Sequence, residues 1–352
     1  MKSISMSKAM KKIISVSIIT VLFISLFISC GDKETKTASS IQTDKLESVA
    51  VGAEKIYLRY KFSKGETFRY KLTTISTNEE AVEADSIMKS KGSQTLSYIF
   101  DCEILDVDED NVAEISLKVS NIKFDAEING TKVSYSSSTK ISDQEKLKFM
   151  EYETIYNTPY RARVNQRGEV LDVSRIEKMV EKMNAMSPQK QNLTTDQKVQ
   201  YAQQLGESAI RPITQMLFRE LPANDVAKDS SWIRQYPQQM GTMRIDNTAK
   251  FTVIDFVKVG DNKAAKINAS LSAIASGPRQ GTENGITYNF GDPKIGGYGT
   301  IIFDFDSGKL IKADTGTDVK MSMRMEGKDS MGKVRKTKRI TNSINKNLVE
   351  LL

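Results

Sequence analysis

The sequence contains no histidine, and this absence restricts its chemistry more than any residue that is present. Without imidazole there is no Ser-His-Asp triad, no histidine general base and no zinc site built on histidine ligands. Carboxylates and lysines can still support catalysis, so an enzyme is disfavoured without being excluded. We therefore expect a protein that is not an enzyme and that carries no cofactor and no metal.

Cysteine and long apolar runs are also scarce: the cysteines are Cys30 and Cys102, and the long apolar run lies at the N-terminus, just before Cys30. Lysines among the first twelve residues precede an uncharged stretch at residues 13–28. This stretch is shorter than the ~20 apolar residues of a typical transmembrane helix. A basic segment followed by a short apolar segment is typical of a secretory signal peptide.

The apolar stretch ends at Ser29-Cys30, which resembles the lipobox of bacterial lipoproteins. The resemblance implies that residues 1–29 are removed, that Cys30 is lipidated and that the protein is anchored in the cell envelope. We expect the outer membrane, on its periplasmic face or at the cell surface. The alternative is an uncleaved N-terminal anchor with Cys30 at the membrane face.

The charge of the mature chain gives no reason to expect a polyanionic partner. Removal of the signal segment lowers the net charge from +7 to +3, because the segment holds four lysines and no acid. We therefore expect no nucleic acid partner. Residues 30–54 are rich in polar residues and poor in large apolar ones, which predicts a flexible tether.

The body of the chain reads mainly as strands. In "LSYIFDCEIL" the apolar residues alternate, which predicts a strand with Cys102 buried on one face. A long hairpin followed by a hairpin with a glycine turn occurs twice, ending at Arg167-Gly168 and at Ser307-Gly308. The predicted fold is mainly β (α+β), with two similar twisted antiparallel sheets or half-barrels at residues 55–173 and 223–352.

A helical insertion is expected between these halves, at residues 174–222. Ser174 and Glu177 have the spacing of a capping box, and Thr194 and Gln197 begin a second helix in the same way. Pro212 is suited to the first turn of a third helical segment. Helices inserted into a sheet protein usually cover one face of the sheet or fill its concavity.

Three segments carry a family resemblance: "FSKGETFRYKLTT", "LPANDVAKDSSWIRQY" and "GTIIFDFDSGKLIKADT". Together they resemble a family of uncharacterised bacterial lipoproteins, domain-of-unknown-function family six-two-six-three, over roughly residues 55–345. The resemblance implies a β protein of the cell envelope. It assigns no activity and no catalytic residue.

Two features are candidates for ligand contacts. Met321, Met323 and Met325 alternate with polar residues, which places them on one face of a strand. Methionine side chains adapt to varied apolar ligands, although core packing is the commoner role. Trp232, the only tryptophan, is expected to anchor the core or to stack against a ligand.

Other motifs have simpler structural interpretations. Residues 106–111 begin like a calcium loop, but they lack the glycine and glutamate of an EF-hand and suit a hairpin turn. Asp304 and Asp306 lead into a glycine turn, where paired carboxylates commonly have a structural role. The basic run at residues 333–346 predicts a final strand at a sheet edge, or contact with anionic lipid head groups.

These observations favour a lipid-anchored envelope protein that binds a hydrophobic or amphipathic ligand, or an envelope component, without catalysis. One alternative is a structural or assembly lipoprotein that docks on an outer-membrane complex. A less favoured alternative is a carboxylate-dependent glycan hydrolase, which needs two carboxyl groups ~5–10 Å apart in a cleft.

Overall fold

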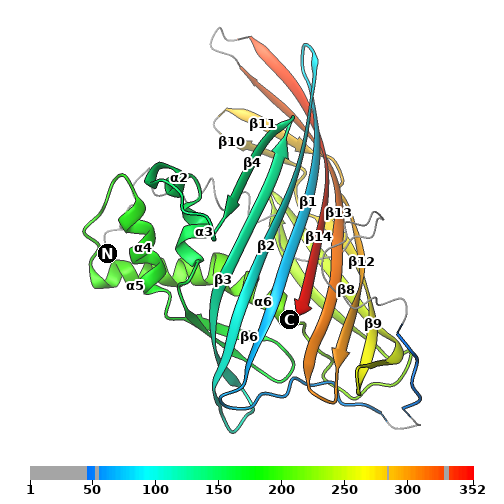
Figure 1. Cartoon of the computed structure of the whole chain (residues 1–352). Coiled ribbons are helices and arrows are strands. Elements are labelled where there is room, and N and C mark those ends of the chain that lie inside the picture. The colour runs from blue at the N-terminus through cyan, green and yellow to red at the C-terminus, as the bar shows by residue number, and fades with distance from the viewer. Residues whose placement is uncertain (1–45, 52–54, 284, 329–332) are drawn as a thin grey trace.

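The computed structural model describes residues 46–51, 55–283, 285–328 and 333–352. In this part of the chain, fourteen strands form one sheet in the order β6-β5-β3-β2-β1-β14-β13-β12-β9-β8-β7, with β4 beside β3 and the β10–β11 pair beside β13 (Figure 1). The mainly β, antiparallel fold that the sequence predicts is confirmed. The signal segment and Cys30 lie outside the described residues, so the lipid anchor remains a prediction.

The elements have the following bounds. The first half comprises β1 (Thr67–Glu83), β2 (Ile87–Val107), β3 (Ala113–Ile128), β4 (Thr131–Ser136), β5 (Tyr160–Val164) and β6 (Val170–Ser174). The helices are α2 (Asp143–Lys148), α3 (Met150–Ile155), α4 (Glu177–Met186), α5 (Thr195–Leu205), the π-helical turn η3 (Gly206–Ile210) and α6 (Arg211–Leu217). The second half comprises β7 (Ser231–Met240), β8 (Met243–Val259), β9 (Asn262–Ser276), β10 (Gln280–Glu283), β11 (Ile286–Phe290), β12 (Lys294–Asp304), β13 (Lys309–Lys328) and β14 (Val334–Leu351).

The two halves are joined into a single sheet by the pairing of β1 with β14. Their register runs from Tyr70 opposite Leu351 to Glu83 opposite Lys338. Strand β14 therefore lies in the middle of the sheet, and its interpretation as an edge strand is wrong. The basic residues near its start are each paired with an acid, as in the Lys338–Glu83 and Arg339–Glu80 ion pairs.

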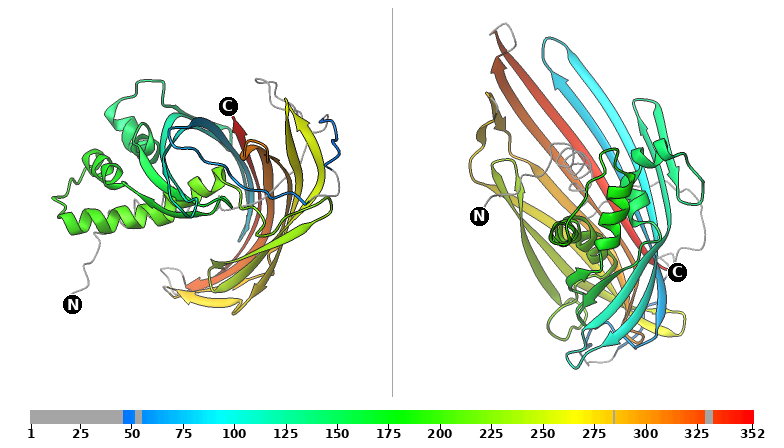
Figure 2. Two further views of the ribbon diagram at one scale, coloured as in Figure 1. Left: turned by 90° about the horizontal axis from the view of Figure 1, so that it is seen from below. Right: turned by 90° about the vertical axis from the view of Figure 1, so that its left-hand side faces the viewer.

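The helices gather beside β3 and β4 at one side of the curved sheet (Figure 2, left). The capping box at Thr194 and Gln197 is confirmed, and Pro212 lies in the first turn of α6. No side chain caps α4, whose N-cap residue is Ile176, so the expected box at Ser174 is wrong. The short helices α2 and α3 were not expected, although Ser142 and Glu145 form a capping box there.

Residues 55–62, which precede β1, form a strap across one end of the sheet. The Tyr60 backbone N–H donates to Gln166 O at 2.8 Å, and the Lys61 N–H donates to Gly308 O at 3.2 Å. The two glycine turns of the internal repeat therefore hold successive residues of the strap. Gly168 and Gly308 both have positive φ, and a Cβ atom on either would collide with the strap.

The strap and α6 close this end of the sheet with an aromatic cluster. The Tyr60 ring packs edge-on against Phe218 and Phe303, with centroid distances of 5.7 and 5.1 Å. Such pairs add ~0.5–1.5 kcal/mol each beyond the burial of their area. We call this the closed end. The opposite ends of β1, β2, β13 and β14 project beyond the helices, and we call this the open end (Figure 1).

The second half of the sheet curls around the segment that follows α6. The Arg219 guanidinium Nη2 donates to the Thr315 hydroxyl on β13 at 3.1 Å, while the next residue, Glu220, pairs with Arg234 on β7. In the sheet order three strands separate β13 from β7. Arg219 and Glu220 can contact β13 and β7 at the same time only if the sheet between these strands is strongly curved. This half is therefore a half-barrel around residues 218–222.

Candidate functional site

The inner face of the half-barrel is the face that carries Thr315 and contacts Arg219. Side chains alternate between the two faces of a strand, so β13 presents Thr315 and Thr317 and then Val319 to this face. The first two are buried at the level of Arg219. Further toward the open end, the same face of β13 becomes apolar.

We call the apolar region the methionine patch. It comprises Val319, Met321, Met323 and Met325 of β13 with Tyr288 and Phe290 of β11. Met323 is opposite Phe290 in the strand register, and Met325 is opposite Tyr288. All six are half-buried, and none belongs to either hydrophobic core cluster of the described residues. The structure thus brings the three predicted methionines together on a face outside the core.

Polar groups border the patch on the side of β14 and β1. The Ser76 hydroxyl donates to the Asn345 side-chain oxygen at 2.8 Å, and the Ser343 hydroxyl donates to Asn78 Oδ1 at 2.8 Å. Nearer the open end, Arg339 lies opposite Met323. The serine and asparagine side chains of this border hydrogen-bond to one another, and they mark the edge of the apolar surface.

On its other side, the patch meets the tip of the β7–β8 hairpin. A Cβ atom on Gly241, in that tip, would lie 2.8 Å from the Phe290 ring, so backbone and ring are in close contact. Met243 and Ile245, on the inner face of β8, are completely buried. The wall of the half-barrel opposite β13 is therefore also apolar at this level.

Besides the β7 side chains of Trp232 and of Arg234, the latter ion-paired with Glu220, two further buried nitrogen donors on the inner side of the half-barrel have no acceptor among the described residues. They are Arg219 Nε and Asn247 Nδ2, in side chains of residues that are 7% and 4% exposed. Burial lowers the pKa of the Arg219 guanidinium to about 10, still well above neutral pH. Within the described part of the chain no carboxylate forms an ion pair with Arg219, so this buried cation has no counter-ion there.

Asn247 and Arg219 are linked through the inner face of β7. Asn247 is directly opposite Tyr236 in the β7–β8 register. Burial raises the pKa of the Tyr236 hydroxyl, and the charge of Arg219 opposes this increase. Glu220, which follows Arg219, pairs with Arg234, and Arg234 precedes Tyr236 by two residues on the same face of β7. On this basis we group Arg219 and Asn247 as the donor pair.

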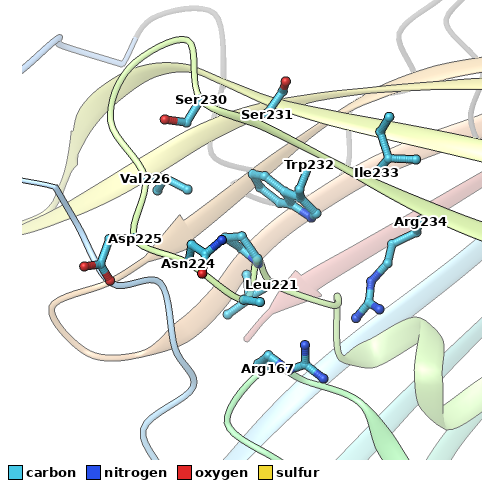
Figure 3. Close-up of a pocket in the computed structure, with 12 residues that line it drawn as sticks. Arg167, Leu221, Asn224, Asp225, Val226, Ser230, Ser231, Trp232, Ile233 and Arg234 are labelled. Atoms are coloured by element: carbon cyan, nitrogen blue, oxygen red, sulfur yellow. The ribbon is translucent and has the colours of Figure 1, made fainter.

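A separate pocket of about 370 Å³ lies between β7 and the loop after α6 (Figure 3). Trp232 forms part of its wall and stacks on Phe251, with a centroid distance of 5.4 Å. The buried indole Nε1 has no hydrogen-bond partner. Both arginines of the pocket have acidic partners, because Arg234 pairs with Glu220 and Arg167 with Glu169.

Trp232 lines a space large enough for a ligand, but it lies apart from the three predicted methionines. Trp232 lies on β7 in the register row that runs through Phe251, whereas the methionines lie on β13 nearer the open end. Of its lining residues only Asp225 carries a carboxylate. The pocket itself therefore lacks the carboxylate pair that the glycan-hydrolase alternative requires.

The acidic motifs have structural roles in turns. Asp304 accepts hydrogen bonds from the backbone N–H groups of Asp306 and Ser307 and from the Asn262 amide. Asp108 accepts from the backbone of Asp110 and Val112, which closes the β2–β3 turn. Cys102 is buried as expected, and burial raises the pKa of its thiol.

Two negative findings apply to the residues whose positions are described. There, no group of three or more Cys, Asp or Glu side chains is arranged to hold a metal ion. In the same residues, no helix has the length and apolar character needed to cross a bilayer.

The donor pair was not among the site residues predicted from the sequence. Asn247 had a detectable signal, because it occupies a position that alternation assigns to the inner face with Ile245 and Ala249. Arg219 had no such signal in the sequence. It follows the buried end of α6, and only the three-dimensional fold shows that it points inward.

Comparison with known proteins gives a family but no function. A family model described as a family of unknown function (DUF6263) matches residues 110–331. Lipovitellin has a similar structure at 9% identity and a TM-score of 0.41, with 83% of this chain and 25% of that chain covered. This chain thus spans about a quarter of the lipovitellin chain. No curated protein shows significant similarity.

Two outer-membrane proteins also show structural similarity. One is an outer membrane channel from Pseudomonas putida F1, at 8% identity and a TM-score of 0.17, with 86% of this chain and 100% of that chain covered. The other is the outer membrane protein OpdK from Pseudomonas aeruginosa, at 7% identity and a TM-score of 0.15, with 79% and 98% covered.

Proposed function

The chain belongs to this family of unknown function, and we propose that it is a lipid-anchored envelope protein that binds a hydrophobic or amphipathic molecule without converting it. The binding surface is the inner face of the half-barrel near the open end. The predicted lipid anchor at Cys30 would hold this surface close to a membrane.

The methionine patch is the observation that carries the proposal. Its six apolar side chains remain half-buried, and none of them packs into a core cluster of the described residues. Apolar surface that is grouped and bordered by polar residues commonly marks a binding site. Methionine has three rotatable bonds and a polarizable sulfur, which suits a flexible apolar ligand.

The roles of the acidic groups support binding over catalysis. Asp304 and Asp108 are engaged by the backbone of the turns that they stabilise. Cys102, whose thiol burial keeps protonated, is enclosed in the sheet and unsuited to nucleophilic attack. These groups account for the strongest acid and nucleophile candidates of the sequence.

The test uses a Met323→Glu variant and a matched Lys320→Glu variant of the delipidated mature protein. Met323 faces inward and Lys320 faces outward on the same strand. We expect Met323→Glu to weaken binding of a fluorescent fatty acid by roughly tenfold or more, because a carboxylate is costly in an apolar site. Lys320→Glu should change the affinity by less than about twofold.

Binding is measured by the probe's own fluorescence and by that of Trp232, the single tryptophan. Melting temperatures of both variants verify that they are folded. If the wild type does not bind the probe, or if Met323→Glu binds it as well as the wild type does, the proposal is wrong.

The assembly alternative has one observation in its favour. On the outer face of the sheet, Ile75 of β1 and Ile344 of β14 lie diagonally across the strand pair and are 42% and 46% exposed. A photo-crosslinker at position 344 that captures one defined envelope protein would support docking by this face. Capture of lipid alone would disfavour it.

A further inference from the structure

The donor pair requires a partner of one chemical kind. Arg219 Nε and Asn247 Nδ2 both present an N–H group, so whatever satisfies them must accept hydrogen bonds. Arg219 also carries a positive charge at more than nine-tenths burial. A buried charge without a counter-ion is strongly unfavourable, and an oxyanion would supply both the charge and the acceptors.

Among the described residues, the acidic and hydroxyl groups beside Arg219 do not supply this anion. Glu220, the acidic residue next to Arg219 in the chain, is engaged by Arg234. Thr315 uses its hydroxyl to accept from Arg219 Nη2 and to donate to the Asn347 carbonyl at 3.2 Å. Glu220 and Thr315 are thus committed to other bonds, while the Nε of the guanidinium has no partner among the described residues.

Arg219 lies at the deep end of the apolar surface. Thr315 contacts Arg219, and Val319 begins the methionine patch four residues further along β13. At ~3.3 Å per residue, the patch starts ~13 Å from this contact and continues toward the open end. An extended molecule with an acidic head at Arg219 would have its chain directed along the patch.

We propose that the half-barrel binds an anionic amphiphile whose carboxylate or phosphate head group is held by Arg219 and Asn247 and whose apolar chain lies on the methionine patch. This inference rests on the proposed function and specifies its ligand class. The arginines of the Trp232 pocket are weaker candidates for the head group, because each already has a carboxylate partner.

The experiment compares three probes on the delipidated mature protein: palmitate, the neutral 1-palmitoylglycerol, and inorganic phosphate. Affinities are measured by native mass spectrometry and by Trp232 fluorescence, with both amphiphiles kept below the concentrations at which they aggregate. We expect the wild type to prefer palmitate over the neutral amphiphile by roughly tenfold or more, since charge-assisted hydrogen bonds are the strong ones. Phosphate alone should bind much more weakly, because it makes no contact with the patch.

Two variants of Arg219 and one control locate the preference. Arg219→Met should reduce the palmitate preference to about onefold and leave the neutral amphiphile unaffected, because only the charged head group uses the guanidinium. Arg219→Lys should retain part of the preference, since it keeps the charge without the planar fork. Lys250→Met removes an exposed cation from β8, the strand that carries Asn247, and should leave the preference unchanged.

The outcomes separate this inference from the proposed function. Equal binding of both amphiphiles to the wild type, or an unchanged preference in Arg219→Met, would overturn the anion site while leaving the binding function in place. Loss of the preference in Lys250→Met as well would show general surface charge and would also overturn it. Binding of phosphate but of neither amphiphile would overturn the proposed function and the ligand class together.

Discussion

The closed end and the inner face of the half-barrel each contain a buried arginine, and the two differ in what surrounds them. Arg59 of the strap and Arg219 are equally buried, at 7% exposed. Arg59 donates to the carbonyl oxygens of Leu58, Pro222 and Ala223, so its guanidinium holds the strap to the loop after α6. Arg219 has an Nε without an acceptor.

The difference separates a structural region from one that is prepared for a partner. At the closed end, aromatic rings fill the space and buried polar groups find acceptors, as with Lys309, which pairs with Glu66 and donates to the Lys61 carbonyl. On the inner face, donors lack acceptors and methionines lie outside the core. Unsatisfied polar groups persist in folded proteins mainly where another requirement outweighs stability.

The largest expected contrast is between the same substitution at the two arginines. Arg59→Met should lower the free energy of unfolding by roughly 3–6 kcal/mol, because it leaves three carbonyls without their donor at a buried site. Arg219→Met should be neutral or stabilising by ~1–4 kcal/mol, because it replaces an unpaired buried charge with an apolar side chain of similar length. Urea unfolding followed by Trp232 fluorescence measures both.

If both variants were destabilised to the same extent, the two arginines would have the same structural role. The contrast between the closed end and the inner face would then fail, and with it the reason for assigning Arg219 to a ligand.

A second contrast concerns the glycine turns that hold the strap. Gly308→Ala should lower the free energy of unfolding by roughly 2–4 kcal/mol, since its φ of 68° is strained for alanine and its Cβ would collide with the Lys61 backbone. Gly260 has a similar φ of 61° but open space around it. Gly260→Ala should therefore cost only ~1 kcal/mol, from the backbone alone.

Thermal or urea unfolding of the two variants gives the comparison directly. Equal losses would mean that the strap is not held at this turn, and that the closed end does not depend on the backbone contact between Lys61 and Gly308.

The sequence indicated the local parts of this fold more reliably than their connection. Alternation around Cys102 predicted its strand, and Thr194 with Gln197 predicted the start of α5. The pairing of β1 with β14 joins residues at opposite ends of the chain, and no local pattern encodes it. For that reason the two expected sheets are halves of a single one, and the basic run lies at its centre.

The same distinction between local patterns and long-range contacts applies to the candidate site. Alternation was sufficient to place Met321, Met323 and Met325 on one face, because that depends only on the two-residue period of a strand. The donor pair depends on the curvature that brings β7 and β13 to the same segment. A charged residue after a helix usually reaches solvent, and only the curled sheet makes Arg219 an interior group.

The smallest expected effect is also the most selective, because it supplies the missing anion from the protein itself. Asn247→Asp places a carboxylate at the donor pair, where it can pair with Arg219. We expect the free energy of unfolding to rise by ~1–2 kcal/mol, since a second charge compensates one that is already buried. The palmitate affinity should fall, because the internal carboxylate competes with the head group. A variant with a purely structural effect would lose stability and affinity together, whereas here the two should change in opposite directions.

Asn247→Leu is the matched control. It removes the amide without adding charge, so it should weaken palmitate binding slightly and leave Arg219 unpaired. Differential scanning calorimetry together with the palmitate titration distinguishes these cases, and a drop in stability for Asn247→Asp would show that the two side chains do not share a site.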